Sequence, residues 1–213
     1  MMIEFLAKGG IMMIPIALCS VLAVAIIVER AVRFARTKND SEELVAQIKH
    51  CILSNKFEEA MALCQHSQDM VARLLEEVIR NRHRPPEDLE KTISLLGSRY
   101  LQDLSKYLRG LGVIGNITPL MGLLGTVLGM VKAFMKVAHL GGKVNPSILA
   151  SGIWEALLTT AAGLSVAIPV LLVYHYLEGK VDEYAFRMQN ASMEILQTLK
   201  GQAYDRVYPE KEG

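Results

Sequence analysis

Three charge-free apolar runs constrain the fold of this 213-residue chain more than any other feature. They comprise residues 9–28, 110–131 and 156–174. Each holds about 19 to 22 residues, which as a helix extends roughly 28–33 Å and matches a hydrocarbon core about 30 Å thick. Residues 29–109 are densely charged and cannot lie in hydrocarbon. The sequence therefore predicts an all-α membrane protein with three transmembrane helices and long helices that extend into the cytoplasm.

The apolar runs divide the chain into six segments. Listed in order, we expect a transmembrane helix in 1–29, a cytoplasmic helical region in 30–109, a second transmembrane helix in 110–138, a short periplasmic loop in 139–147, a third transmembrane helix in 148–178, and a cytoplasmic C-terminal helix and tail in 179–213.

The first apolar run could instead be a signal peptide, with Lys8 as its basic region and "IALCS" as a lipoprotein cleavage site at Cys19. Two features oppose that interpretation. The apolar run continues to Val28, and Leu18 is larger than the small residue that cleavage requires before the cysteine. We therefore expect a retained transmembrane helix.

The distribution of Lys and Arg near the apolar runs predicts the orientation, because these residues accumulate on the cytoplasmic side. The predicted periplasmic side carries Lys8, Lys132, Lys136 and Lys143. The other side carries more basic residues, namely Arg30, Arg33, Arg36, Lys38, Arg99, Lys106, Arg109, Lys180 and Arg187. This asymmetry predicts a periplasmic N-terminus and a cytoplasmic C-terminus.

Charge, cysteines and motifs narrow the function. The net charge of +1 gives no reason to expect nucleic-acid binding. Cys64 and His66 lie close in sequence, but there is no second close pair and no CxxC, so we expect no metal site and no cofactor. The chain contains no GxSxG, HExxH or Walker motif, and we expect it not to be an enzyme.

The cytoplasmic region reads as short helices followed by a long one. Asn55 with Glu58 resembles a capping box. Pro85 and Pro86 break the chain and suit the first turn of the next helix. One apolar stripe comprises Val71, Leu74, Leu75, Val78 and Ile79, and a second comprises Leu89, Ile93, Leu96, Tyr100, Leu104 and Leu108. The second stripe predicts one unbroken helix that continues into the second apolar run.

Small residues in the second and third runs predict close helix packing, because helices in lipid associate where backbones can approach. Gly115, Gly122 and Gly129 recur every seven residues, Gly125 broadens their face, and Gly163 ends the "TTAAG" of the third run. Packing within one subunit and packing between subunits both satisfy this pattern. Pro119 and Pro169 each predict a kink that frees a carbonyl one turn upstream.

Polar residues interrupt the same two helices. Glu155 reads as the only acidic residue within or bordering the second and third runs, and an ionisable group in a membrane normally faces water or a partner. Were the helix to begin at Ile153, Glu155 would instead be an N-terminal charge favoured by the helix dipole. Thr159 shares the face of Glu155, Thr160 is rotated by about 140° from it, and Thr126 lies among the glycines. A single membrane threonine usually bonds its own helix.

The segments "GNITPLMGLLGTVLGMVKAF" and "GIWEALLTTAAGLSVAIPVLLVYHYL" resemble the two signature segments of the MotA/TolQ/ExbB proton-channel family. The likeness is close over residues 110–178, and the remaining chain agrees in layout. Three spans rather than four point to the ExbB/TolQ branch, and most of all to ExbB.

This resemblance implies a ring-shaped oligomer, a pentamer, in the inner membrane of a bacterium. The second and third helices would line a pore that holds the single-span helices of a dimeric ExbD- or TolR-like partner. The pore residues of the family match Glu155, Thr126 and Thr160, and Thr159 adds a hydroxyl where some relatives have alanine. Trp154 departs from the small residue often found there. The complex would use the proton-motive force to do mechanical work on a TonB- or TolA-like protein.

Other functions remain as alternatives. A self-contained secondary transporter predicts internal repeats and several intramembrane charges, and neither is found in the sequence. A membrane enzyme or receptor would need a catalytic or ligand-binding domain. Within the family, TolQ-like envelope maintenance or a gliding-motor stator competes with the ExbB-like role. The sequence leaves the choice between H⁺ and Na⁺ open.

Overall fold

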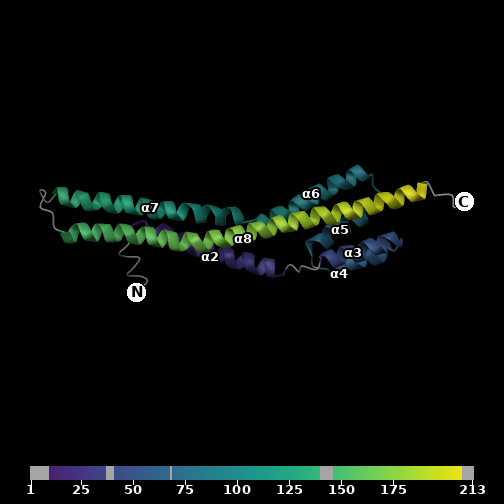
Figure 1. Cartoon of the computed structure of the whole chain (residues 1–213), viewed down its shortest axis with the longest axis horizontal. Helices are drawn as coiled ribbons and strands as arrows, with labels where there is room; N and C mark the ends of the chain where they lie inside the picture. The colour runs from purple at the N-terminus through teal and green to yellow at the C-terminus, as the bar shows by residue number, and fades with distance from the viewer. Residues whose placement is uncertain (1–9, 37–40, 68, 140–145, 208–213) are drawn as a thin grey trace. The chain divides into compact units, whose positions relative to one another are not determined.

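The computed structural model describes residues 10–36, 41–67, 69–139 and 146–207, and its regular elements there are all α-helices. In chain order these are α2 (Met13–Arg36), α3 (Ser41–Leu53), α4 (Phe57–His66), α5 (Met70–Arg80), α6 (Pro86–Ser105), α7 (Leu108–His139) and α8 (Pro146–Val207), labelled in Figure 1. The chain divides into two compact units, the first formed by residues 1–30 and 107–178, and the second by residues 31–106 and 179–213. Most of the predicted loop 139–147 and the last residues of the predicted tail lie outside the described residues.

Three helices, α2, α7 and α8, are long and apolar enough to cross a membrane. Only 22 to 33% of the residues in their most apolar windows are buried within the chain. Most of the apolar surface of these helices therefore faces outward, and it requires lipid or another protein chain to cover it.

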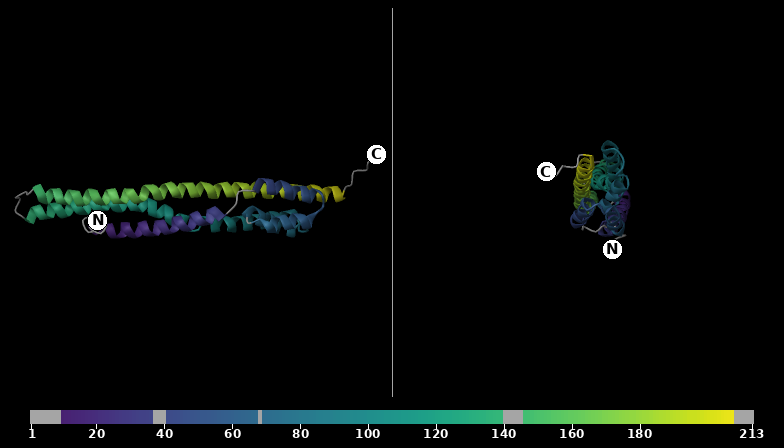
Figure 2. Two further views of the ribbon diagram at one scale, coloured as in Figure 1. Left: turned by 90° about the horizontal axis from the view of Figure 1, so that it is seen from below. Right: turned by 90° about the vertical axis from the view of Figure 1, so that its right-hand side faces the viewer.

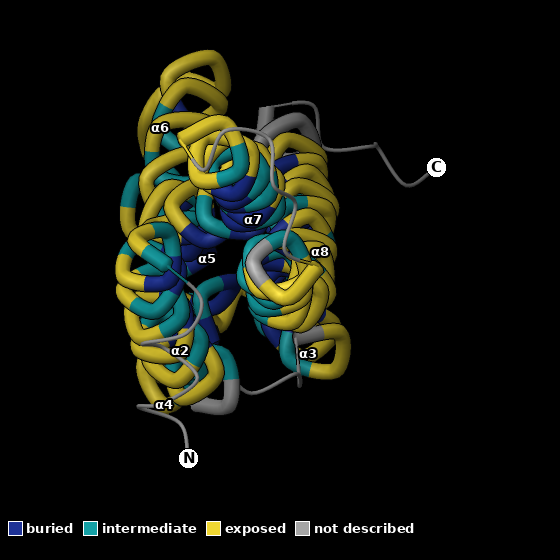
Figure 3. The backbone as a smooth tube through the Cα atoms, turned by 90° about the vertical axis from the view of Figure 1, so that its left-hand side faces the viewer, coloured by how far each residue is buried: buried dark blue, intermediate teal, exposed yellow. Residues whose placement is uncertain are grey.

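In the first unit, α7 and α8 lie side by side, with α7 in teal and the first part of α8 in green in Figure 2. The buried glycines of α7 lie on the side that faces α8, and the buried positions of α7 are dark blue in Figure 3. Glycines form much of that side, and buried positions recur along it with a helical period. The buried residues of α7 are Leu108, Leu111, Gly112, Gly115, Thr118, Gly122, Gly125, Gly129 and Ala133.

The second unit has an apolar core formed by α3, α4, α5 and the distal part of α8. The predicted stripe of α5 is confirmed, because its five members are at most 1% exposed. Asp69 caps α5 by accepting a hydrogen bond from the Val71 amide at 3.0 Å. From α8, Met188, Ala191 and Ile195 complete the core.

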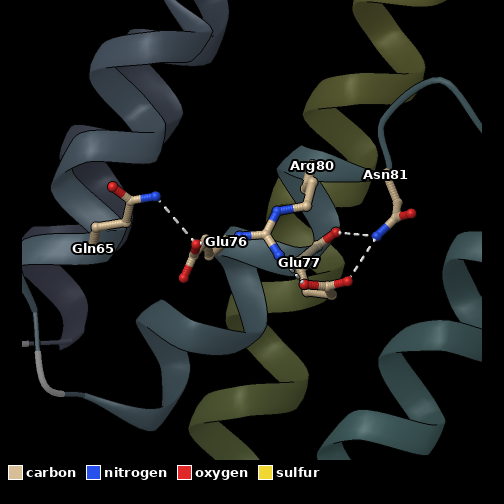
Figure 4. Close-up of polar contacts among 5 residues, drawn as sticks. All are labelled: Gln65, Glu76, Glu77, Arg80 and Asn81. Atoms are coloured by element: carbon tan, nitrogen blue, oxygen red, sulfur yellow. Dashed lines mark hydrogen bonds and ion pairs between the residues drawn. The ribbon is translucent and has the colours of Figure 1, made fainter.

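The polar face of α5 carries a hydrogen-bonded network that joins it to α4 (Figure 4). Arg80 binds Glu76 at 2.5 Å and Glu77 at 3.0 Å. The Gln65 amide of α4 donates to Glu76 at 3.3 Å, and the Asn81 amide donates to Glu77. These exposed pairs each contribute roughly 0.2–0.5 kcal/mol, so the buried stripe contributes most of the stability of this helix.

The expected capping box at Asn55 is wrong. Helix α4 begins at Phe57, its N-cap is Lys56, and no side chain caps it. Asn55 has a φ of 56° and its amide donates to the Ile52 carbonyl, while the Lys56 amide donates to the Cys51 carbonyl, both at 2.9 Å. This is the Schellman pattern, so Asn55 ends α3 and does not start α4.

The expectation of one unbroken helix through Leu104 and Leu108 is also wrong. Helix α6 ends at Ser105, where Lys106 adopts an extended ψ of 134°, and α7 begins at Leu108. Between them Tyr107 has a φ of 66°, which a bulky residue adopts only when its surroundings hold it there. The Arg30 guanidinium lies 5.3 Å from the Tyr107 ring centroid and contributes to that hold. By contrast, Pro86 is the first residue of α6, as predicted, and Pro85 precedes it as the N-cap.

Candidate functional site

At Gly163 and Gly122 the backbones of α7 and α8 are in close contact. A Cβ added at Gly163 would lie 2.7 Å from the Thr118 carbonyl oxygen and 3.2 Å from the Gly122 Cα. A Cβ added at Gly122 would lie 3.0 Å from both the Thr159 carbonyl oxygen and the Thr160 Cα. The predicted packing glycines thus lie between two helices of one chain. Gly115, Gly125 and Gly129 face α8 in the same way, against Leu171, Thr159 and Ala156 respectively.

Glu155 lies well inside α8. The helix begins at Pro146, nine residues earlier, which is roughly 13–14 Å along its axis. Because the helix dipole acts mainly within the first turn, it does not explain a carboxylate at this position. The Lys132 ammonium of α7 lies 3.8 Å from a Glu155 carboxylate oxygen, and the side chains are 56% and 32% exposed.

Gly10, just before α2, also lies against Glu155. It has a φ of 69°, and a Cβ added there would lie 2.2 Å from the same carboxylate oxygen of Glu155. The carboxylate is therefore approached by an ammonium from α7 and by main chain from the N-terminal side of α2.

Thr159 is 1% exposed and lies between α7 and α8. Its hydroxyl donates within its own helix to the Glu155 and Ala156 carbonyls, both at 2.9 Å. A Cβ added at Gly125 would lie 2.7 Å from the Thr159 Cβ, so the threonine fills the space that this glycine leaves. The sequence placed Thr159 beside Glu155, and the structure adds that its side chain is enclosed by its own subunit.

Thr160 contacts α7 at Gly122, and Thr126 lies about one turn further along that helix. The Thr160 hydroxyl donates across the helix pair to the Gly122 carbonyl at 3.1 Å. That carbonyl is also the α-helical acceptor for the Thr126 amide, because Thr126 follows Gly122 by four residues. The Thr126 hydroxyl donates to the Leu123 carbonyl at 2.6 Å. All three threonine hydroxyls thus donate to backbone carbonyls and not to the Glu155 carboxylate.

Several polar residues of the first unit were not predicted from the sequence. Lys132, one of the charges near the predicted loop, pairs with Glu155. Thr118 lies among the glycines, is fully buried, and donates to its own helix, a position that its spacing from Gly115 and Gly122 could have indicated. Glu178, which accepts a hydrogen bond from the Tyr174 hydroxyl at 2.6 Å, is a second carboxylate that borders the third run. Glu155 is therefore not the only one.

Pro119 and Pro169 lie inside α7 and α8, and both helices continue through them. Cys64 lies in the core of the second unit, where burial raises the pKa of its thiol to about 12. Within the described ranges, no three His, Cys, Asp or Glu residues are grouped as metal ligands would be.

The fold and this site define a class of protein, namely an α-helical membrane protein whose glycine-packed helices carry sparse polar groups. The chain belongs to the MotA/TolQ/ExbB proton channel family, whose model matches residues 54–190.

Curated relatives agree with this membership. The chain is 32% identical over 177 residues to the putative biopolymer transport protein ExbB-like 1 of Synechocystis sp., covering 82% of this chain and 69% of the relative. It is 28% identical to the biopolymer transport protein exbB1 of Vibrio cholerae, over 76% of this chain and 72% of the relative. For the biopolymer transport protein ExbB of Pseudomonas putida the identity is 26%, over 93% of this chain and 63% of the relative. The predicted likeness to ExbB is confirmed.

A solved structure, that of C. jejuni MotAB, has the same fold. It superposes with a TM-score of 0.67 over 91% of this chain and 78% of the compared chain, at 16% sequence identity. At this identity the likeness concerns the fold alone.

Proposed function

We propose that this chain is the ring-forming subunit of a proton-driven motor in a bacterial inner membrane. With an ExbD-like single-span partner it would convert the proton-motive force into mechanical work on a TonB-like protein and so energise transport across the outer membrane. The N-terminus would be periplasmic and the C-terminus cytoplasmic, as the Lys and Arg distribution predicts.

The observation that carries this proposal is the carboxylate of Glu155 within an otherwise apolar part of α8, in a member of a proton-channel family. An ionisable side chain at membrane depth costs roughly 2.5–3.5 kcal/mol on insertion scales, so it is retained where it serves a pathway or a partner. Thr160, whose hydroxyl donates to the Gly122 carbonyl of α7, and Thr126 add hydroxyls to the same helix pair.

A pentameric ring would cover the outward apolar faces of α7 and α8. Residues such as Val127 and Leu157 are 53% and 61% exposed in the single chain. Neighbouring copies would bury part of that surface, and the partner's helices would occupy the axis. Copies that associate head to tail through such a surface form a closed ring when the rotation from one copy to the next adds up to a full turn.

In this mechanism a carboxylate on the partner's helix carries the proton. While it is charged, it is held near the hydroxyls of Thr126 and Thr160, because an apolar wall would not solvate it. Once protonated, it can pass the smooth, glycine-rich wall, and the two components turn relative to each other. Release of the proton to the cytoplasmic side restores the charged carboxylate and completes the step.

TolQ-like envelope maintenance and a gliding-motor stator are the runner-up functions, since they would use the same pore. The ExbB names of the curated relatives favour the transport role.

Proton flux into vesicles tests the proposal. The chain would be reconstituted with a candidate single-span partner, and internal pH followed under an imposed gradient. We expect Glu155→Ala to abolish flux, and Thr126→Ala or Thr160→Ala to reduce it strongly. Thr198→Ala, on α8 but outside the apolar part, is the matched control, because its hydroxyl also donates to its own helix. Unchanged flux in all three test variants would remove the site assignment, and a monomer by native mass spectrometry would contradict the ring.

A further inference from the structure

The ion pair between Lys132 and Glu155 lies where the two helices are in close contact. A Cβ added at Gly129 would lie 3.1 Å from the Ala156 Cβ, and one added at Gly152 would lie 2.4 Å from the Ala133 Cβ. These contacts flank Lys132 on α7 and Glu155 on α8. The helix backbones are therefore held together at this level, and the two charged side chains extend from a fixed separation.

The space around the carboxylate is limited on a second side. Gly10 approaches so closely that an added Cβ would lie 2.2 Å from the carboxylate oxygen that faces Lys132. One oxygen of Glu155 thus has an ammonium at 3.8 Å and main chain beside it.

From these contacts we infer that Lys132 is a tethered counter-ion that keeps Na⁺ and other monovalent metal ions away from Glu155. The ammonium already supplies the positive charge that the carboxylate attracts, and a second cation would meet a like charge within a few ångströms. A metal ion must also replace part of its water shell with several oxygen atoms, and at the carboxylate oxygen that faces Lys132 the ammonium and Gly10 already occupy two directions of approach. A proton needs one oxygen lone pair and no coordination shell, so it can still reach the site.

This inference deepens the proposed function and rests on it for its consequence, because it assigns H⁺ and not Na⁺ to the pathway. It makes Lys132 a selectivity-determining residue. The sodium-binding property belongs to the chain alone and can be measured without a partner.

The test is a ²³Na relaxation titration of the purified full chain in detergent, over a range of NaCl at constant ionic strength. Wild type should show no saturable broadening. Lys132→Met should bind Na⁺ at least about tenfold more tightly, the change that about 1.4 kcal/mol of lost repulsion produces. Lys136→Met, which removes the same charge one turn further along α7, is the matched control and should behave as wild type.

Two further variants show whether the new sodium site is Glu155. In Lys132→Met with Glu155→Gln the broadening should disappear, and in Lys132→Arg, which keeps the cation, it should not arise. Should Lys132→Met fail to fold by circular dichroism, Lys132→Gln replaces it. Equal sodium binding in Lys132→Met and Lys136→Met, or binding that survives Glu155→Gln, would overturn the inference.

Flux measurements separate this inference from the proposed function. In vesicles with the partner, added Na⁺ should inhibit proton flux through Lys132→Met and not through wild type. If wild type carries protons but Lys132→Met is equally insensitive to Na⁺, the inference fails and the proposed function stands. If wild type carries no protons while the sodium titration gives the expected pattern, the proposed function fails and the counter-ion role stands.

Discussion

The packing of α7 on α8 makes a sharp prediction for Gly163→Ala. The new methyl group would lie 2.7 Å from the Thr118 carbonyl oxygen and 3.2 Å from the Gly122 Cα. Both neighbours are backbone atoms of another helix, so they cannot turn away as a side chain would. The helices must separate by several tenths of an ångström, and overpacking of this kind costs about 1–3 kcal/mol.

Gly179→Ala on the same helix is the matched control, because nothing lies within 4 Å of the added methyl group. Both substitutions gain the same helix propensity, roughly 1 kcal/mol, so their difference isolates the steric cost. For a chain of this size, 1–3 kcal/mol corresponds to a difference in melting temperature of about 2–12 °C.

The assay is thermal unfolding of the two variants in the same detergent, followed by circular dichroism at 222 nm. We expect Gly179→Ala to melt at or slightly above wild type, and Gly163→Ala to melt clearly below Gly179→Ala. Equal melting temperatures, or a higher one for Gly163→Ala, would refute the close α7–α8 contact and the role of its glycines.

Further predictions concern three residues of the second unit. Asn55→Gly should be nearly neutral and Asn55→Ala destabilising by about 1 kcal/mol in chemical denaturation, because φ is 56° there; equal effects would contradict the Schellman turn. Asp69→Ala should lower the free energy of unfolding by about 0.5–2 kcal/mol, because it removes the cap on the Val71 amide. A loss of hydrogen-exchange protection confined to the amides of α5 would identify that cause. The Cys64 thiol should resist maleimide at pH 8 while Cys51 reacts, since burial raises the Cys64 pKa to about 12. Unfolded Cys64 ionises near its ordinary value of 9.0 and folded Cys64 does not, so the free energy of unfolding should fall as pH rises from about 9 toward 12. In Cys64→Ala the free energy of unfolding should no longer fall over this pH range. If it still falls, other groups cause the effect.

The sequence alone was enough for features that depend on local chemistry. Three apolar runs identify the helices that can cross a membrane, because length and hydropathy are properties of each segment and do not depend on which helices pack against it. The α5 stripe and the start of α6 at Pro86 follow from periodicity and from the missing proline amide. The family motifs identified the helix pair that carries Glu155.

The tertiary structure decided whatever depends on which helix faces meet. Asn55 and Glu58 have capping-box spacing, but only the backbone path shows that Asn55 closes the preceding helix. The apolar spacing continues across Lys106 and Tyr107, so periodicity cannot detect a break that no Gly or Pro marks. Likewise, Lys132 and Glu155 are distant in sequence, and Thr159 and Thr160 are adjacent. Only the way in which α7 packs on α8 brings Lys132 next to Glu155. Because successive residues of a helix are turned by about 100°, the same packing buries Thr159 while Thr160 donates to Gly122 of α7.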